Sequence, residues 1–189
     1  KLFFKRLIIM SEKNLSDQST RSNQASISID WSYADAPEST SHVTFSKHYG
    51  FFIDGSFTEY NENQSFESIN PTNGESLYRC TEANKSDVDA AVTAARKAFK
   101  GTWGTTSGTL RSHHLYRIAR MLQERAREFA VLESMDGGKP IRESRDIDIP
   151  LAAAYFFYYS VWADKLAYAF PGKSPKPLGV CAQIIPWNF

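Results

Sequence analysis

Hydrophobic and polar positions divide the chain into a polar leading stretch, a region of short strands and a longer region of helical period. Ser11–Ser28 contains no aromatic residue and few large aliphatic ones. Such a stretch buries too little apolar surface to offset the entropy lost on ordering. We therefore expect a disordered tail over residues 1–45 and a folded region over residues 46–189.

Two hairpins are predicted at the start of the folded region. In Phe51–Phe57, apolar residues flank Asp54-Gly55, a pair typical of the type I′ turn because both residues tolerate positive φ. The second hairpin runs from a strand over Ser65–Asn70 through the turn Pro71–Gly74 to a strand over Ser76–Cys80. Together they predict a small antiparallel unit.

The apolar period then becomes helical. A cap at Ser86 is followed by an apolar stripe at Val88, Ala91, Val92, Ala95 and Phe99. A second stripe predicts one helix through Leu115–Phe129 that ends at Asp136–Pro140, where a glycine can take the left-handed conformation. A phosphate-binding loop is the weaker alternative for Asp136–Pro140, because the spacing of a P-loop and a preceding strand are missing.

The last part of the chain predicts a buried helix and a buried strand. Pro150 fits a first helical turn, and Leu151–Ala163 is apolar but too short to span a bilayer, so we expect a helix packed on a sheet. The run from Gly179 to Phe189 has no polar face, which suits a parallel strand covered on both sides. The expected fold class is α/β, with an antiparallel hairpin unit, a helical layer and the first strand of an incomplete Rossmann-like nucleotide-binding sheet.

Composition and charge limit the range of possible partners and sites. The net charge of +1 gives no electrostatic attraction to nucleic acid or to anionic membranes, so neither is an expected partner. Cys80 and Cys181 form no disulfide framework, which indicates a reducing, cytoplasmic compartment. We expect Cys181 to be buried and inert in its strand. Neighbouring His113 and His114 point in different directions on a helix, so no metal site is predicted.

Asn188 is the residue with the clearest chemical potential. It follows the predicted terminal strand, and open α/β sheets bind ligands beyond the carboxyl ends of their strands. Its carboxamide donates hydrogen bonds without carrying charge, which suits an oxyanion hole. An ordinary turn asparagine is the alternative, and spacing alone favours it.

Five stretches in the same order resemble motifs of the aldehyde dehydrogenase superfamily and cover roughly His48 to Phe189. They are Phe52–Gly55 with Ile69–Glu75, Asp87–Val92 with Ala94–Phe99, Leu132–Pro140, Tyr158-Tyr159 with Trp162–Lys165, and Gly179–Phe189. The resemblance implies oxidation of a small-molecule aldehyde to a carboxylic acid with NAD or NADP, through a cysteine nucleophile and a glutamate-activated water. It also implies that Asn188 is the oxyanion donor and that Ile184, Ile185, Pro186 and Trp187 line the cofactor cleft.

Two departures from the family pattern affect what is expected of this chain. The nucleophilic cysteine and the base glutamate belong to family segments beyond Phe189, so the chain alone should be inactive. The link Lys165–Leu178 is shorter than in typical members, where a hairpin builds oligomer contacts. Whether this chain forms a homo-oligomer therefore stays an open question. The short link and Ser32–Ser39 resemble the family-16 branch. A non-catalytic scaffold and an independent binding module are alternatives, but the module would leave its terminal strand as an uncovered apolar edge.

Overall fold

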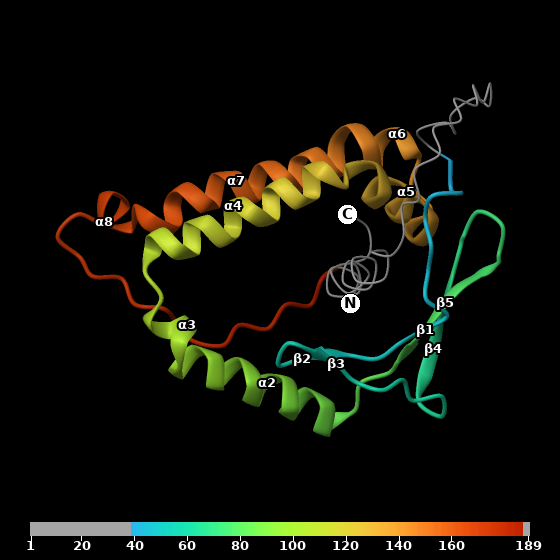
Figure 1. Ribbon diagram of the computed structural model, residues 1–189, viewed down its shortest axis with the longest axis horizontal. Coiled ribbons are helices and arrows are strands. Elements are labelled where there is room, and N and C mark those ends of the chain that lie inside the picture. The colour runs from blue at the N-terminus through green and yellow to red at the C-terminus, as the bar shows by residue number, and fades with distance from the viewer. Residues whose placement is uncertain (1–38, 187–189) are drawn as a thin grey trace, which may run out of the picture.

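The computed structural model describes residues 39–186, which form a frame of helices, a small sheet and a separate hairpin (Figure 1). Most of the expected tail, and Trp187, Asn188 and Phe189, lie outside the described residues. The strands are β1 (His48–Tyr49), β2 (Phe52–Ile53), β3 (Ser56–Phe57), β4 (Ser65–Ile69) and β5 (Ser76–Thr81). The helices are α2 (Lys85–Lys100), α3 (Thr102–Thr105), α4 (Gly108–Glu124), α5 (Ala126–Gly137), α6 (Ile141–Glu143), the π-helical η2 (Ser144–Asp148), α7 (Ile149–Asp164) and α8 (Leu166–Ala169).

The first predicted hairpin is confirmed. Strands β2 and β3 pair antiparallel, with Phe52 opposite Phe57. Asp54 and Gly55 both have positive φ, 52° and 83°, as a type I′ turn requires. The two phenylalanine rings lie 4.9 Å apart, so the local turn is supported by a cross-strand aromatic pair.

The main sheet has three strands in the order β1-β5-β4. The antiparallel pairing of β4 with β5 is confirmed. The two predicted hairpins lie in separate sheets, and β1, which lies outside both of them, pairs in parallel with β5, with His48 opposite Arg79. A parallel pair needs a long crossover, and the intervening hairpin and β4 provide it.

Helix α2 begins with a capping box. The Asn84 side-chain oxygen accepts hydrogen bonds from the backbone N–H groups of Ser86 and Asp87, at 2.7 and 3.2 Å, and Asp87 accepts one from the Asn84 N–H. The predicted cap at Ser86 is therefore wrong by two positions. Either side chain suits a cap, and each has a carboxylate three residues later, Asp87 after Asn84 and Asp89 after Ser86. In the structure Asp87 completes the capping box, whereas Asp89 pairs with Lys85.

The predicted long second helix is two helices, α4 and α5. The helical conformation is interrupted at Arg125, which has φ −111° and ψ 21°. Its guanidinium holds the Glu128 carboxylate through two hydrogen bonds, at 2.9 and 2.6 Å. The predicted end is confirmed, because Gly138 takes the left-handed conformation at φ 71° and donates its N–H to the Ser134 carbonyl.

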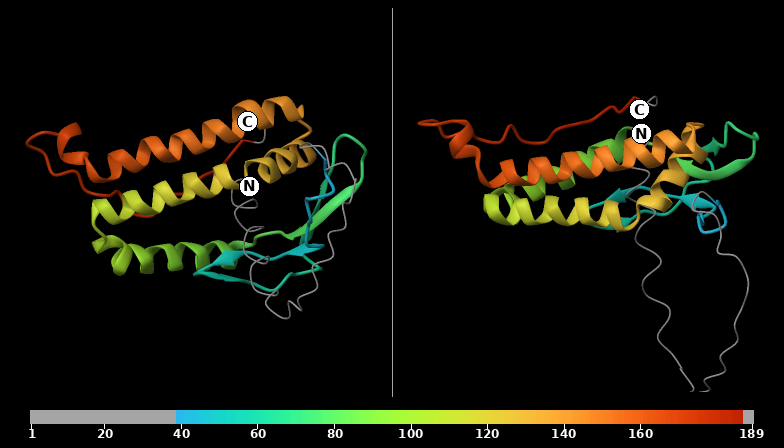
Figure 2. Two further views of the ribbon diagram at one scale, coloured as in Figure 1. Left: turned by 45° about the horizontal axis from the view of Figure 1, so that its top comes forward. Right: turned by 90° about the horizontal axis from the view of Figure 1, so that it is seen from above.

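The hydrophobic core lies where α4, α5 and α7 meet. Its buried residues are Leu122, Phe129, Ala130, Ile149 and Ala153. Helix α7 lies along α4 in every view, so the predicted position of α7 on a sheet is wrong (Figure 2). Its far side remains exposed at Tyr155, Tyr158 and Tyr159.

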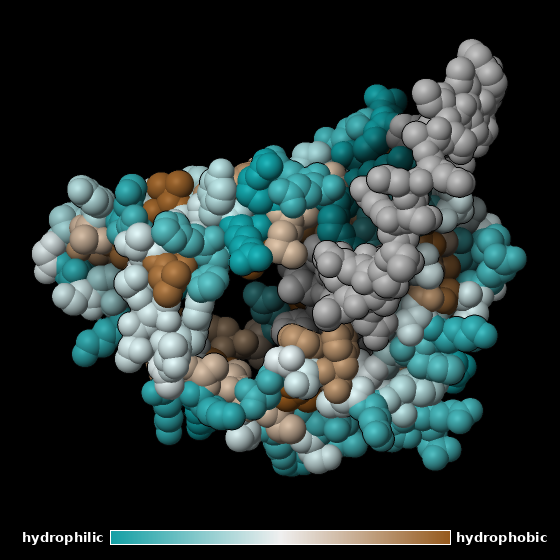
Figure 3. Space-filling model, viewed as in Figure 1, coloured by the Kyte–Doolittle hydropathy of each residue, from teal (hydrophilic) through white to brown (hydrophobic). Residues whose placement is uncertain are grey.

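The helical layer and α2 face each other across a hollow that is bordered in part by hydrophobic residues (Figure 3). No strand among residues 39–186 fills the place where the nucleotide-binding sheet was expected. Nor is any helix in this part of the chain both long and apolar enough to cross a membrane.

Candidate functional site

The candidate site is the segment Leu178–Pro186, which leads towards Asn188. Between α8 and Pro186 the chain forms neither helix nor strand (Figure 1). Among the described residues no strand pairs with it, so the expected parallel strand is wrong. A parallel strand forms only beside a neighbour that pairs its N–H and C=O groups. Without that neighbour, Leu178 and Ile184 are 100% and 97% exposed.

The predicted cofactor-contacting residues are only partly placed. Ile184 and Pro186 are exposed and Ile185 is half-buried. Trp187 and Asn188 lie outside the described residues. The roles of all five residues stay predictions.

The two cysteines lie in different environments. Cys181 is exposed rather than buried, because the strand that would have covered it does not form. Its sulfur lies 3.8 Å from the Gly179 carbonyl oxygen. Cys80, in β5, is the buried one.

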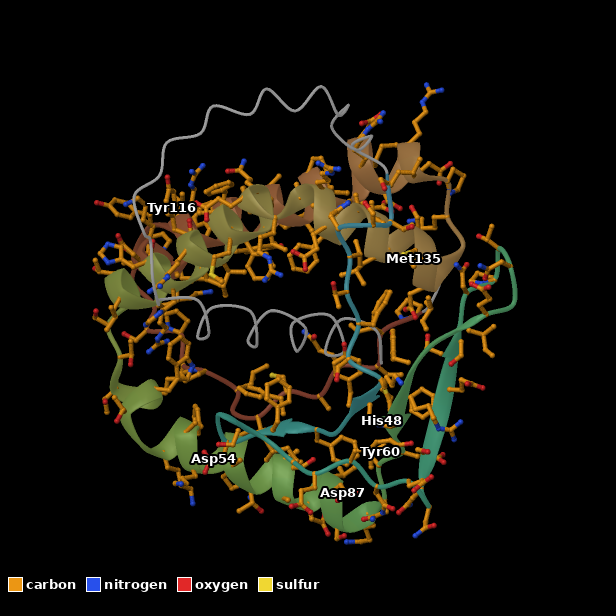
Figure 4. All side chains as sticks on the ribbon, turned by 45° about the vertical axis from the view of Figure 1, so that its right-hand side comes forward. His48, Asp54, Tyr60, Asp87, Tyr116 and Met135 are labelled. Atoms are coloured by element: carbon orange, nitrogen blue, oxygen red, sulfur yellow. The ribbon has the colours of Figure 1, made fainter. Side chains whose placement is uncertain are left out.

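A polar cluster that the sequence did not predict joins the strands of the main sheet. The Arg79 guanidinium donates to the Tyr60 hydroxyl and to the Ser65 hydroxyl, each at 3.1 Å. Tyr60 donates to Ser65 at 2.9 Å, and the His48 ring stacks on the Tyr60 ring at 4.4 Å (Figure 4). These groups bind one another, so the cluster supports the sheet. The parallel pairing of β1 brings His48 here, and no local pattern signals that pairing.

The two histidines of α4 form no metal site in the described chain. The His114 ring lies 5.9 Å from that of Trp103. No group of three or more potential ligands gathers among residues 39–186.

The loop after α5 behaves as a helix cap. Lys139 pairs with Asp148, and both side chains are largely buried, at 18% and 13% exposure. A lysine engaged in this way is not available to a phosphate. The capping interpretation of Asp136–Pro140 therefore holds over the phosphate-binding alternative.

The fold is part of an α/β domain of the nucleotide-binding type. It combines a small sheet, a hairpin and a helical layer with an apolar segment whose sequence ends in Pro-Trp-Asn-Phe. The sequence model described as "Aldehyde dehydrogenase family" matches residues 57–189. The chain belongs to the aldehyde dehydrogenase family. Its assignment to the family-16 branch stays a prediction.

Individual relatives agree with this assignment. The chain is 43% identical over 148 residues to a Bacillus subtilis protein described as "Putative aldehyde dehydrogenase DhaS", covering 73% of this chain and 30% of that one. It is 39% identical to an aldehyde dehydrogenase of Aspergillus niger over 155 residues, covering 78% of this chain and 31% of that one. The chain thus spans about 30% of the length of these curated relatives.

Solved structures support the fold. An NAD⁺ complex of an aldehyde dehydrogenase from Bacillus cereus superposes with a TM-score of 0.58 at 36% identity. The superposition covers 61% of this chain and 24% of that one. The described frame is therefore part of the aldehyde dehydrogenase fold.

Proposed function

We propose that this chain is part of an enzyme that oxidises an aldehyde to a carboxylic acid with NAD or NADP. The observation that carries the proposal is the family match over residues 57–189, which includes the intact Pro186-Trp187-Asn188-Phe189 motif. The proposal applies to a protein of full family length, because this chain spans about 30% of its relatives. A small-molecule aldehyde is the substrate, and the cytoplasm is the proposed compartment.

Asn188 stabilises the negative charge that develops during the reaction. Its side-chain amide donates a hydrogen bond to the carbonyl oxygen of the aldehyde as a nucleophile attacks the carbonyl carbon. The nucleophile is a cysteine of the family's later segments, and neither Cys80 nor Cys181 takes this role. The 189-residue chain by itself is therefore inactive.

Ile184, Ile185, Pro186 and Trp187 contact the cofactor. Ile184 and Pro186 are exposed and uncharged, which fits side chains that cover an apolar part of a bound nucleotide. NAD or NADP, when bound, supplies the hydride acceptor of the oxidation. Asn188, at the end of the same segment, lies next to these contacts in sequence and can therefore hold the substrate oxygen beside the cofactor.

Substitution of Asn188 in the full-length enzyme tests the proposal. We expect Asn188→Ala to lower kcat by roughly 10²–10³-fold, because one oxyanion-hole donor is lost. Formation of NADH or NADPH with test aldehydes measures the rate. Gln183→Ala is the matched control, since Gln183 is a polar residue of the same segment with no assigned role. A fall of less than tenfold for Asn188→Ala would remove the residue from this role.

A non-catalytic scaffold is the second candidate. The shortened link from Lys165 to Leu178 favours it, because this link contains α8 and extended chain but no hairpin. A full-length protein that folds, binds neither NAD nor NADP and turns over no aldehyde would support the scaffold. Its oligomeric state, measured by light scattering, would test whether the short link removes the usual subunit contacts.

A further inference from the structure

The segment Asp136–Lys139, at the carboxyl end of α5, has no part in the proposed chemistry. We call it the α5 junction. Its residues contact both the three-stranded sheet and the start of α7, which lie on different sides of α5 (Figure 1).

The first arm of the junction is Asp136, which holds the sheet. One carboxylate oxygen accepts hydrogen bonds from the Tyr78 hydroxyl at 2.8 Å and from the Ser68 hydroxyl. Ser68 and Tyr78 are directly paired across β4 and β5, so one carboxylate holds both strands. Tyr78 is only 5% exposed. Burial, and then the Asp136 charge, raise the pKa of Tyr78, which keeps its hydroxyl protonated as a donor.

The backbone of the junction reinforces this arm. Gly138 has φ 71°, and a Cβ placed on it would lie 2.6 Å from Cγ of Pro71, in the turn between β4 and β5. Only a residue without a side chain allows this approach. The end of α5 therefore lies directly against the sheet's turn.

The second arm is Lys139, which holds the start of α7. Its ammonium group pairs with Asp148, the last residue of η2 before α7. A hydrogen bond at 3.2 Å between the hydroxyls of Ser134 and the fully buried Ser144 ties α5 to η2 nearby. A partly buried pair such as Lys139 with Asp148 is costly to break from one side, because a charge would be left unpaired.

We propose that the α5 junction is a two-armed clamp that couples the sheet to the start of α7. Asp136 and Lys139 are separated only by Gly137 and Gly138, and the left-handed Gly138 closes the helix end between them. A displacement of one arm is therefore transmitted to the other. The clamp sets where α7 begins relative to the sheet. This inference rests on the contacts of the described residues and not on the proposed activity.

Hydrogen exchange of the 189-residue chain, followed by mass spectrometry, tests the coupling. We expect Asp136→Ala to speed exchange about tenfold or more in β4 and β5, because Tyr78 loses a buried acceptor. Exchange in η2 and the first turn of α7 should rise as well, although the two hydrogen bonds described for Asp136 run to β4 and β5. Lys139→Met should produce the reciprocal effect on the sheet. Asp136→Asn, which keeps an acceptor oxygen, should restore most of the protection.

Two adjacent glycines provide a matched pair of variants. Gly138→Ala should open the sheet turn and the start of α7, because its Cβ meets Pro71. At Gly137 the nearest atom to an added Cβ is Oε1 of Glu133, at 3.4 Å, so Gly137→Ala should leave exchange unchanged. The double variant Gly138→Ala with Pro71→Gly separates the clash from the strain of positive φ, and should recover part of the protection.

The pattern of exchange decides the outcome. Faster exchange in both arms, with α2 unaffected, supports the clamp. Faster exchange confined to the arm that lost its contact, in both Asp136→Ala and Lys139→Met, overturns it. If Asp136→Ala unfolds the whole chain, Lys139→Met and Gly138→Ala are judged by the same criterion. Asp89→Ala, which removes an exposed pair with Lys85, should change neither arm.

Discussion

Helix α7 and the segment Leu178–Pro186 are both apolar in sequence, yet they have opposite environments. Helix α7 buries Ile149 and Ala153 in the core, whereas Ile184 is almost fully exposed. A helix pairs its backbone groups within itself and needs partners only for its side chains. A strand needs a neighbour for its backbone as well. Apolar patterning therefore indicates that a stretch is suited to burial, but not whether its partner is present.

Helix α7 itself is only partly buried. The run from Ile149 to Ala163 has no charged residue, and a helix apolar on all sides is normally buried. Here α4 covers one side, and three tyrosines, Tyr155, Tyr158 and Tyr159, remain more than half exposed on the other. Their hydroxyl groups make this exposure tolerable, because each ring presents a polar tip to water.

The largest expected effect comes from removing a core side chain beside α7. We expect Phe129→Ala to lower the free energy of unfolding by about 3–5 kcal/mol, through lost burial and the cavity left behind. Ile184→Ala should change it by less than about 0.5 kcal/mol, since Ile184 contacts little. Urea unfolding of both variants measures the contrast. Similar losses in the two variants would mean that the segment is packed in solution.

The contact between α4 and α7 gives the second effect. A Cβ on Gly108 would lie 2.6 Å from the Ala163 carbonyl oxygen, so the helices meet there backbone to backbone. We expect Gly108→Ala to destabilise the chain by about 1–3 kcal/mol, as overpacking does. Thr109→Ala, at the next exposed position, is the control for helix propensity. A stabilising Gly108→Ala would show that the two helices can separate there without loss.

The third effect concerns a buried polar group in the sheet. Because the folded state raises the pKa of Tyr78, the unfolded chain loses this proton first as pH rises above about 10. The unfolded state then binds fewer protons, so stability should fall with pH by up to about 1.4 kcal/mol per unit. In Tyr78→Phe this part of the slope should be absent. Denaturation between pH 9 and 11 compares the slopes, and equal slopes would contradict the assignment.

The smallest effect separates the two candidate caps of α2. We expect Asn84→Ala to cost about 1 kcal/mol, because the capping side chain is lost. Ser86→Ala should cost much less, since the Ser86 hydroxyl contacts only the Asn84 side chain among the hydrogen bonds of this cap. Thermal unfolding followed by circular dichroism resolves the pair. A larger loss of stability in Ser86→Ala than in Asn84→Ala would show that Ser86 is the cap, as the sequence pattern predicted.

Two features set by a few adjacent residues were predicted correctly, whereas the N-terminal cap of α2 was misplaced by two positions. The turn at Asp54-Gly55 and the left-handed Gly138 follow from glycine's freedom at positive φ. The break at Arg125 was missed, because the apolar stripe runs through it without interruption. The parallel pairing of β1 with β5 was missed because it joins residues about thirty positions apart. No local propensity encodes such a contact.

The candidate site was identified almost entirely from its motif. Asn188, with Ile184 to Trp187, was selected by resemblance to family sequences, and the family match includes these positions. The polar cluster of Arg79, Tyr60 and Ser65 was not anticipated. Its members come from a loop and two strands, and only the strand register brings them together.

The sequence by itself determined the family, the turn at Asp54-Gly55, the left-handed cap at Gly138, and the stretches suited to helix or strand. These depend on residue types at short separations, where backbone sterics and local hydrogen bonds dominate. The tertiary structure decided what covers each apolar stretch: α4 lies against α7, and no described strand pairs with Leu178–Pro186. It also decided that Asp136 binds β4 and β5. The hydrophobic effect is non-directional, so the pattern of apolar residues does not specify which surface covers them.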